Sequence, residues 1–576
     1  MNAFRKMLDD RLGMFVHYGI YSALAGRYNG KEIEGLGEWI QRRAEIPIAE
    51  YEKIGRESFL PAKDYAQRLV ASAKAAGVRY IVLTAKHHDG FALFKTAVDG
   101  YNTYDFYGRD LCAELADECR KAGLEVGFYY SHTLDWHEKN AAGNIAVSGA
   151  YRADNRNFWD FPNDDIDFSQ YFNDKCLPQV RELLTGYGKL KLIWFDFPHD
   201  ITCEQSLELK NLVKELQPDC LINSRIGYGL CDYYSMGDNS LPSQPNGLNN
   251  ECLITLNNTW GYKESDNAWK PAEDVIEILC RALTSDSSLL INVGPYANGY
   301  LTPETEQILS SLSEWTERNG EAIYNGVSGN PLSTVFEWGH IAIKDRRLLL
   351  FIKDRGVGTV RISGIEGADV LGARILGSDA EVKASVSGDE LCVAFSDTCM
   401  IFPVVEITFS TAPTYSSLIK QNGSVLNLPI QKALVSHNGN EPEPILAEND
   451  YYHSDYGKRG LSVNCETALH SWDSSADEIV WEAYVTQGGE YTAKVISAPI
   501  QTDAAFTLSV ADKKYPLPCG WSGNFCISLT GEQNKRLVKA VDGIKIDSVG
   551  RCRIGLSMDS DGVGLKLTGI KLTKNG

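Results

Sequence analysis

The sequence predicts an α/β protein with an irregular (β/α) TIM-like barrel followed by two β-sandwich domains. Two observations lead to this prediction. Between residue 60 and about residue 325, short apolar runs alternate with amphipathic helical stretches, which is typical of a parallel sheet and, at this length, of a barrel. After residue 330 the helical stretches stop, and short strands separated by turn residues follow one another, as in antiparallel sandwiches.

The barrel prediction depends on helix–strand units that repeat along the chain. The expected pairs are a helix at 64–78 with a strand at 79–91, 111–124 with 125–133, 170–188 with 189–197, 203–219 with 220–227, and 272–286 with 288–295. In such a barrel the active site lies at the C-terminal ends of the strands. We therefore look for functional residues where each apolar run ends.

The 576 residues are too many for one ordinary domain. We expect the barrel at 1–328 and a first β-sandwich at 329–412. A polar stretch with Pro and Ser at 411–422 then leads to a second β-sandwich at 420–576. No internal repeat or low-complexity tract interrupts this order.

Composition and charge exclude several classes of function. The net charge of −20 disfavours nucleic acid and anionic membranes as partners and favours a neutral one. The sequence has no run of eighteen apolar residues, so it predicts no membrane span. The N-terminus shows no signal-peptide pattern, and the 14 cysteines form no CxxC or zinc-type spacing. These features predict a cytoplasmic protein with free thiols, or a secreted one if a signal peptide has been removed.

Polar and aromatic residues gather where the predicted strands end. The segments are FVHYG, LTAKHHDGF, FYYSHTLDWHE, LIWFDF and LINSRIG, with GEW in a loop. Each residue alone has a structural explanation, since an Asp after a strand is often a helix N-cap and a strand-end His can bond to backbone. Their convergence on one face of a barrel is more typical of an active site.

The residue types narrow the chemistry. No GxGxxG follows the first strand and no P-loop is present, so nucleotide cofactors are not expected. The His-x-His of metal-dependent amidohydrolase barrels is also missing, and we expect no metal and no cofactor. Aromatic platforms with His, Asp and Glu hydrogen-bonding groups suit a sugar, and two carboxylates can hydrolyse a glycosidic bond.

Seven ordered segments resemble the α-L-fucosidases of glycoside hydrolase family 29. They are RLGMFVHYGIYS, GEWI, FLPAKDYAQRLVASAKAAGVRYIVLTAKHHDGFALF, GLEVGFYYSHTLDWHE, LIWFDF, LNNTWGY and LLINVGPYANGYL. The resemblance covers about residues 8–410. It implies a retaining exo-α-L-fucosidase that acts on a fucosylated oligosaccharide or glycoconjugate, and homo-oligomerisation is left open.

The resemblance assigns roles to individual residues. Asp196, which ends LIWFDF, matches the nucleophile that forms a covalent fucosyl-enzyme. Arg225 matches a strand-end arginine that keeps this carboxylate ionised. The residues implied to contact the hydroxyls of fucose are His17, Glu38, His87, His88 and Tyr130, and those implied to form an apolar wall are Trp39 and Trp194.

Two carboxylates compete for the role of general acid/base. Asp238 lies 42 residues after the nucleophile, where many members of the family carry Glu. Glu251 matches the Glu of a Trp-Glu motif of the family, although Asn250 replaces the Trp. Position favours Asp238 slightly, and the sequence leaves both open.

The resemblance also bears on the β domains and on alternative functions. The first sandwich matches the domain that follows the barrel in this family. The second resembles carbohydrate-binding modules, with Trp472 and Trp521 expected to be exposed, or it stabilises the protein or mediates oligomerisation. The alternatives to a fucosidase are a glycosidase for a related sugar such as α-L-galactoside and an inactive glycan-binding protein.

Overall fold

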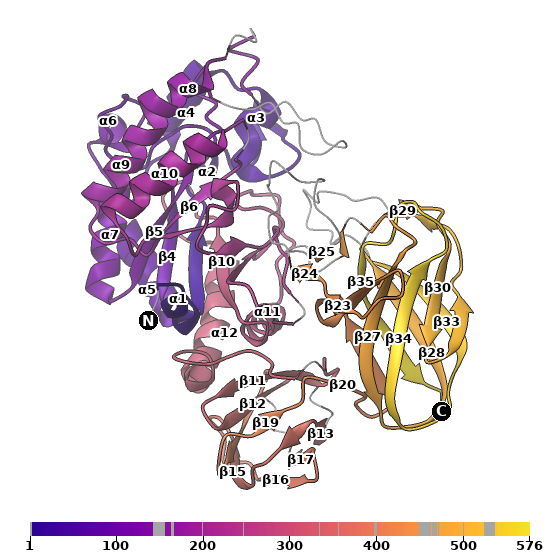
Figure 1. Ribbon diagram of the computed structural model, residues 1–576. Helices are drawn as coiled ribbons and strands as arrows, with labels where there is room; N and C mark the ends of the chain where they lie inside the picture. Colours follow the sequence, from indigo (N-terminus) through magenta and orange to yellow (C-terminus); the bar gives the residue numbers. More distant parts are fainter. Residues whose placement is uncertain are drawn as a thin grey trace.

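The structure is a computed structural model in which three modules follow one another along the chain (Figure 1). It describes residues 3–575 apart from 142–155, 163–165, 199, 243, 246, 333, 355, 357, 397–399, 448–461, 464–468, 471, 499 and 523–535.

Eight parallel strands form the barrel. They are β1 (Leu12–Val16), β4 (Tyr80–Lys86), β5 (Glu125–Ser131), β6 (Leu192–Asp196), β7 (Leu221–Ile222), β8 (Tyr234–Ser235), β9 (Asn250–Thr255) and β10 (Ser287–Val293). Their order in the sheet is β7-β6-β5-β4-β1-β10-β9-β8. A parallel bridge between Asn223 and Tyr233 joins the two ends of this order and closes the barrel. The closed barrel confirms the predicted fold class.

The barrel interior is filled by every second residue of its strands, as the period of a strand requires. These side chains form one buried core that includes Phe15, Tyr80, Val82, Tyr129, Leu192, Trp194, Leu253 and Leu290. Met7 and Leu8 of the N-terminal helix belong to the same core. The barrel is therefore a packed core rather than a channel, and only the strand ends are available for a site.

Helices and short helical turns connect the strands. They are α1 (Ala3–Asp10), α2 (Tyr21–Leu24), η1 (Gly37–Trp39), α3 (Ile40–Ala44), α4 (Ile48–Ser58), α5 (Tyr65–Ala75), α6 (Thr103–Tyr107), α7 (Leu111–Ala122), α8 (Phe168–Tyr171), η2 (Phe172–Cys176), α9 (Leu177–Gly186), α10 (Cys203–Leu216), η3 (Ser224–Ile226), α11 (Ala272–Thr284), α12 (Pro303–Asn319) and η4 (Gly320–Ala322). A short hairpin of β2 (Arg27–Tyr28) and β3 (Lys31–Glu32) follows α2.

Local sequence explains where several of these helices begin. The Asp110 side chain accepts a hydrogen bond from the Ala113 N–H at the start of α7. Thr202 and Gln205 form a reciprocal capping box at the start of α10. Between β7 and β8 the chain makes only the turn η3, and the described residues of the loop from β8 to β9 include no helix. The barrel is irregular at this point, which leaves room for functional loops.

The first sandwich consists of β11 (Gly339–Lys344), β12 (Arg347–Ile352), β13 (Thr359–Ser363), β14 (Ile365–Glu366), β15 (Val370–Ile375), β16 (Val382–Ser387), β17 (Glu390–Phe395), β18 (Val404–Phe409) and β19 (Thr414–Tyr415). The sheet β11-β12-β18-β15 contributes Leu349, Phe351 and Val404 to the core that surrounds the barrel. Trp315 of α12 donates from Nε1 to the Phe402 carbonyl at 3.0 Å. This sandwich therefore packs directly on the barrel.

The second sandwich is assembled from β20 (Ile419–Lys420), β21 (Val425–Pro429), η5 (Ile430–Lys432), β22 (Leu434–His437), β23 (Glu443–Pro444), β24 (Leu446–Ala447), β25 (Ser462–Val463), β26 (Leu469–His470), β27 (Asp477–Val485), β28 (Gly489–Ser497), β29 (Gln501–Thr502), β30 (Phe506–Val510), β31 (Lys513–Pro516), β32 (Trp521–Ser522), β33 (Leu537–Ile546), β34 (Gly550–Met558) and β35 (Leu567–Lys574). Within 411–422, β19 pairs with β14 and β20 pairs with β27, so this stretch belongs partly to both sandwiches.

The prediction of exposed aromatic residues on the second sandwich is wrong. Trp472 and Trp521 are both buried and belong to its hydrophobic core. The Trp472 ring contacts Phe506 at 5.5 Å between centroids, and Trp521 lies under the ammonium of Lys539. Neither ring is free to stack on a sugar, because each contributes apolar area to the core of the sandwich instead.

Two further features concern the whole chain. No helix among the described residues is long and apolar enough to cross a membrane. The cysteines that the structure describes are free thiols, and most of them are buried.

Candidate active site

Asp196 is the last residue of β6, at the C-terminal end of the barrel. It follows Trp194 by two residues, so both side chains face the barrel interior, and Asp196 is 8% exposed. Arg225 donates from Nη1 to its Oδ1 at 2.9 Å. The Tyr129 hydroxyl donates to its Oδ2, also at 2.9 Å. Both oxygens of this carboxylate are therefore held by donors, which fixes its orientation.

Arg225 joins Asp196 to Asp238. Arg225 lies in η3, and its second terminal nitrogen donates to Asp238 Oδ1 at 2.5 Å. The Asp238 side chain is 49% exposed, in contrast to that of Asp196. The next residue, Asn239, donates its N–H to the Leu253 carbonyl at 3.0 Å and thereby ties this loop to β9. The irregular part of the barrel thus brings a second, open carboxylate to the end of β6.

Three histidines lie beside these acids. The His17 Nδ1 is 2.6 Å from the side-chain oxygen of Asn292, whose amide nitrogen donates to the Trp260 carbonyl. Nδ1 of His17 is therefore the protonated nitrogen. Burial lowers the pKa of His17 to about 3 and that of His87 well below its usual range, so both rings are neutral at pH 7.

His88 is oriented by a chain of hydrogen bonds. The Ser131 hydroxyl donates to the Leu134 carbonyl at 2.7 Å, so it accepts from Nδ1 of His88, also at 2.7 Å. Nε2 of His88 lies 3.7 Å from Asp196 Oδ2. When the ring is neutral, this Nε2 is an acceptor on the side of the nucleophile candidate, where a sugar hydroxyl can donate to it.

Aromatic rings border this group of residues. The Trp39 ring is 5.2 Å from that of His88 and 5.8 Å from that of Phe197. On the other side, the Trp260 ring is 5.3 Å from that of His17. Such rings offer flat apolar faces to the C–H face of a sugar.

Glu38 is buried next to the same cluster. Its Oε2 accepts from the Gly261 N–H at 2.8 Å and from the Thr259 hydroxyl at 3.3 Å. Burial raises the pKa of Glu38 to about 7, and the charge of Asp238 adds to the shift. We call His17, Glu38, His87, His88, Tyr129, Asp196, Arg225 and Asp238 the strand-end cluster.

Three residues named from the sequence lie elsewhere. Tyr130 faces the surrounding helices, where its hydroxyl donates to Gln179 at 2.8 Å, and this placement does not support contact with a sugar. Trp194 is 1% exposed and packs inside the barrel below the strand ends, so it offers no open apolar face. Glu251 is 0% exposed, near the start of β9, and it accepts hydrogen bonds from Trp194 and Tyr80.

Two residues of the cluster region carry no role in the sequence-based prediction. Tyr129 takes the place expected of Tyr130, because neighbouring residues of a strand face opposite sides. Trp260, in LNNTWGY, provides an aromatic face beside His17. The motif LNNTWGY could have pointed to Trp260 as a site residue. Nothing in FYYSHT indicates which of the two tyrosines faces the barrel interior.

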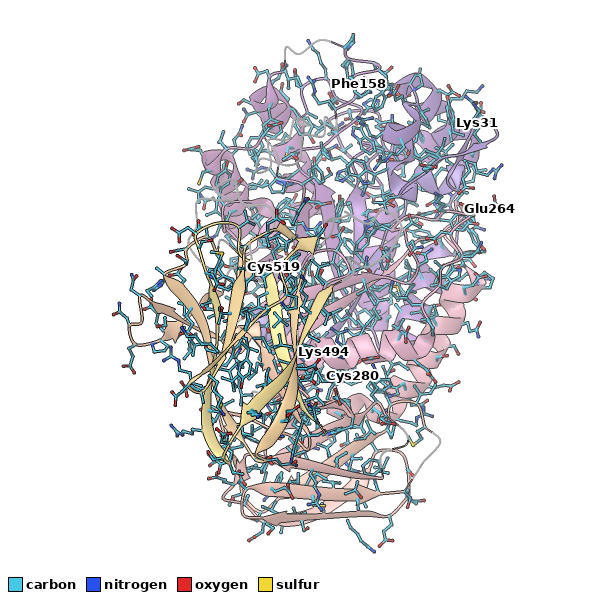
Figure 2. All side chains as sticks on the ribbon, turned by 90° about the vertical axis from the view of Figure 1, so that its right-hand side faces the viewer. Lys31, Phe158, Glu264, Cys280, Lys494 and Cys519 are labelled. Carbon is cyan, nitrogen blue, oxygen red and sulfur yellow. The ribbon has the colours of Figure 1, made fainter. Side chains whose placement is uncertain are left out.

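Loops that follow the strands surround this end of the barrel. Lys31 belongs to the hairpin after β1 and Phe158 to the segment after β5, and both lie at the upper end of the barrel in Figure 2, away from the first sandwich. The guanidinium of Arg42, in α3, lies 4.8 Å from the centre of the Phe158 ring, so the stretch after β1 contacts the segment after β5. Among the described residues, no group of His, Cys, Asp and Glu is arranged to hold a metal ion.

The strand-end cluster combines the parts that glycoside hydrolysis needs. It offers one carboxylate fixed by two donors, a second that is accessible to solvent, neutral imidazoles and aromatic faces. This combination is suited to attack at an anomeric carbon with proton transfer to the leaving oxygen.

Comparison with known proteins agrees with this chemistry. A sequence model of the family described as α-L-fucosidase matches residues 2–321. The tissue α-L-fucosidase of Rattus norvegicus is 28% identical over 345 residues, which are 55% of this chain and 68% of the rat protein.

Solved structures are similar over different parts of the chain. The α-L-fucosidase from Vibrio sp. strain EJY3 shares the fold over 100% of this chain and 98% of its own, with a TM-score of 0.81 and 24% identity. A mutant of α-L-fucosidase AlfC from Lactobacillus casei, in complex with 4-nitrophenyl α-L-fucopyranoside, has 38% identity and a TM-score of 0.52 over 55% of this chain and 99% of its own. The chain belongs to the α-L-fucosidase family, glycoside hydrolase family 29, and is a glycoside hydrolase.

Proposed function

We propose that this protein is a retaining exo-α-L-fucosidase in which Asp196 is the nucleophile and Asp238 the general acid/base. The observation that carries the proposal is the guanidinium of Arg225, which donates to both carboxylates, at 2.9 Å to Asp196 and 2.5 Å to Asp238. Membership of the α-L-fucosidase family supports the choice of sugar. A shared guanidinium keeps the two acids close, as a retaining enzyme needs, with carboxyl groups about 5–5.5 Å apart.

In the first step, Asp196 attacks the anomeric carbon as the glycosidic C–O bond breaks, and Asp238 gives its proton to the leaving oxygen. In the second step, Asp238 removes a proton from water, and the resulting hydroxide displaces Asp196 from the sugar. Fucose leaves with the α configuration that the substrate had.

Arg225 supports the second step by holding Asp238. In the covalent intermediate Asp196 is an ester and carries no charge, so Asp238 is the carboxylate that pairs with the guanidinium. That pairing holds the carboxylate of Asp238 in place for its action as a base. The open position of Asp238 also suits a group that must meet both the departing sugar and the incoming water.

Glu251 is the less favoured candidate for the acid/base. It is fully buried and bonded to Trp194 and Tyr80, and burial raises its pKa to about 7. A raised pKa suits an acid. However, a group that is 0% exposed and enclosed by the barrel core has no path to a leaving oxygen.

AlfC guides the choice of natural substrate. A structure of that protein contains Fucα(1,6)GlcNAc, with 38% identity to this chain. We propose fucosylated oligosaccharides or glycoconjugates as substrates, with this disaccharide as the first glycan to test beside the α1,2 and α1,3/4 linkages.

Azide tests the assignments of the two acids. With 4-nitrophenyl α-L-fucoside, an Asp196→Gly variant should form β-L-fucosyl azide, because azide replaces the missing nucleophile. An Asp238→Gly variant should form α-L-fucosyl azide, because azide intercepts the covalent intermediate. Glu251→Gly is the matched control and should form neither product.

Two results would contradict the proposal. One is full turnover by Asp196→Ala. The other is rescue to the α-azide in Glu251→Gly but not in Asp238→Gly. The anomer of fucose that the wild-type protein releases first, followed by proton NMR, tests retention independently.

A further inference from the structure

Glu251 is a buried carboxyl group that the proposed mechanism does not use. Its Oε2 accepts from Trp194 Nε1 at 2.9 Å, and its Oε1 accepts from the Tyr80 hydroxyl at 3.1 Å. All three side chains are at most 1% exposed. A carboxyl group placed in a barrel core is costly unless it is well bonded, and a purely apolar residue would fill the same space without that cost.

Trp194 touches both side chains that hold the nucleophile. Its ring is stacked on that of Tyr129, with centroids 5.7 Å apart and an angle of 19°. The guanidinium of Arg225 lies 4.9 Å from the centre of the Trp194 ring. Tyr129 and Arg225 in turn donate to the two oxygens of Asp196. One indole therefore supports both donors of the nucleophile.

We propose that Glu251 is a positioning residue for hydrolysis: by binding Nε1 of Trp194 it fixes the indole against which Tyr129 and Arg225 rest, and so fixes Asp196. This inference rests on the proposed function, in which Asp196 is the nucleophile. A reacting group displaced by about 1 Å costs about 10²-fold in rate. Loss of the anchor should therefore lower kcat by roughly 10- to 100-fold and leave fucose binding nearly unchanged.

The test compares four variants on 4-nitrophenyl α-L-fucoside. Glu251→Met keeps an unbranched side chain of similar length but removes both carboxyl oxygens, which accept from Trp194 and Tyr80. Trp194→Phe keeps a ring and removes the donor. The third variant combines both changes. Tyr80→Phe is the matched control, because it removes a buried hydroxyl from the same carboxyl group without touching the indole.

We expect Glu251→Met and Trp194→Phe to lose kcat to a similar extent, and the double variant to lose little more than either. Such non-additivity shows that the two residues act through one another. KM and the dissociation constant of fucose should stay within about threefold of the wild type, and Tyr80→Phe should keep most of kcat.

Three results would overturn the inference: wild-type kcat in folded Glu251→Met, a change confined to KM, or fully additive losses in the double variant. If Glu251→Met does not fold, Trp194→Phe is measured alone, and wild-type kcat in that variant would overturn the inference. Failure of the proposed function gives a different pattern, since the wild type would then be inactive or Asp196→Ala would remain active.

Discussion

Asp135 joins two buried lysines behind the strand-end cluster, and its replacement by Asn is the most informative test of how the barrel end is held. Its Oδ2 is 3.0 Å from Lys86 Nζ and 3.1 Å from Lys175 Nζ. Burial alone would raise the pKa of Asp135, but Lys175 and Lys86 outweigh it and lower the pKa to about 2. The next residue, Trp136, donates its backbone N–H to the His88 carbonyl at 2.7 Å.

The stability lost in Asp135→Asn depends on the partners that remain to Lys86. Lys175 has two other carboxylate partners, Asp99 and Glu138, whereas Lys86 keeps the Tyr171 hydroxyl. Breaking a buried ion pair from one side costs about 3–5 kcal/mol.

In Asp135→Asn, Lys86 can lose its proton instead of remaining a buried, unpaired cation. The free energy of deprotonation is therefore the upper limit of the stability that the unpaired Lys86 can cost. Holding a lysine neutral costs about 1.4 kcal/mol for each unit between its ordinary pKa of about 10.4 and the pH. That limit is about 4.6 kcal/mol at pH 7 and about 1.9 kcal/mol at pH 9. With Lys86 neutral in the native variant, the unfolded variant binds one proton more than the native one. The free energy of unfolding of Asp135→Asn therefore rises with pH relative to that of the wild type.

Urea unfolding at pH 7 and pH 9 measures this difference. Tryptophan fluorescence and residual activity are followed together, so that the transition of the barrel is separated from those of the sandwiches. The matched control is Asp219→Asn, which breaks a pair with Lys189 of the same length, 3.0 Å, but with side chains about 70% exposed. An exposed pair contributes little. A loss at pH 7 no larger than that of Asp219→Asn, or a deficit that does not shrink at pH 9, would refute this reasoning.

Three further predictions concern the strand ends. Tyr129→Phe should lower kcat by about tenfold or more, because it removes a charge-assisted hydrogen bond to Asp196, the proposed nucleophile, whereas Tyr130→Phe should keep kcat. Equal kcat values for the two variants in steady-state assays would argue against this. Gly90→Ala should lower the thermal midpoint, because the backbone has φ +76° and the new Cβ would lie 2.0 Å from a buried carboxylate oxygen; Gly100→Ala, with open space around it, should not. The native pKa of His17 is about 3 and its unfolded value about 6.5, so stability is lost as pH falls from 6.5 towards 3. His17→Gln should flatten that slope by up to about 1.4 kcal/mol per pH unit, and parallel slopes in urea titrations would contradict it.

Much of the candidate site was predictable because strand ends in a barrel share one face. Asp196, Arg225, His17 and His88 all follow apolar runs, and the structure brings them to the same end of the barrel. The tyrosine assignment failed by one residue. In a strand, a shift of one position reverses the side that a residue faces, and the FYY of FYYSHT places aromatic residues on both sides. The choice between Tyr129 and Tyr130 therefore depended on which face packs against the helices.

The two acid candidates illustrate the same limit at longer range. Asp238 and Glu251 are 13 residues apart, and both follow segments that read as loop or strand. Their environments differ because Asp238 lies in the loop after β8, beside Arg225, whereas Glu251 lies near the start of β9 among core residues. No local pattern contains this information. Whether a residue lies at the N-terminal or the C-terminal end of a strand depends on where pairing with the neighbouring strands begins.

The sequence by itself determined the alternation of helix and strand, the change to β structure after the barrel, the family, and Asp196 as the nucleophile candidate. These properties are encoded in the local period of apolar residues and in the order of motifs. Only the tertiary structure decided which carboxylate shares Arg225 with Asp196, and that Trp194 and Glu251 lie beneath the site rather than in it. The physical reason is that a closed barrel brings together side chains from distant strands, and such contacts exist only once the sheet has closed.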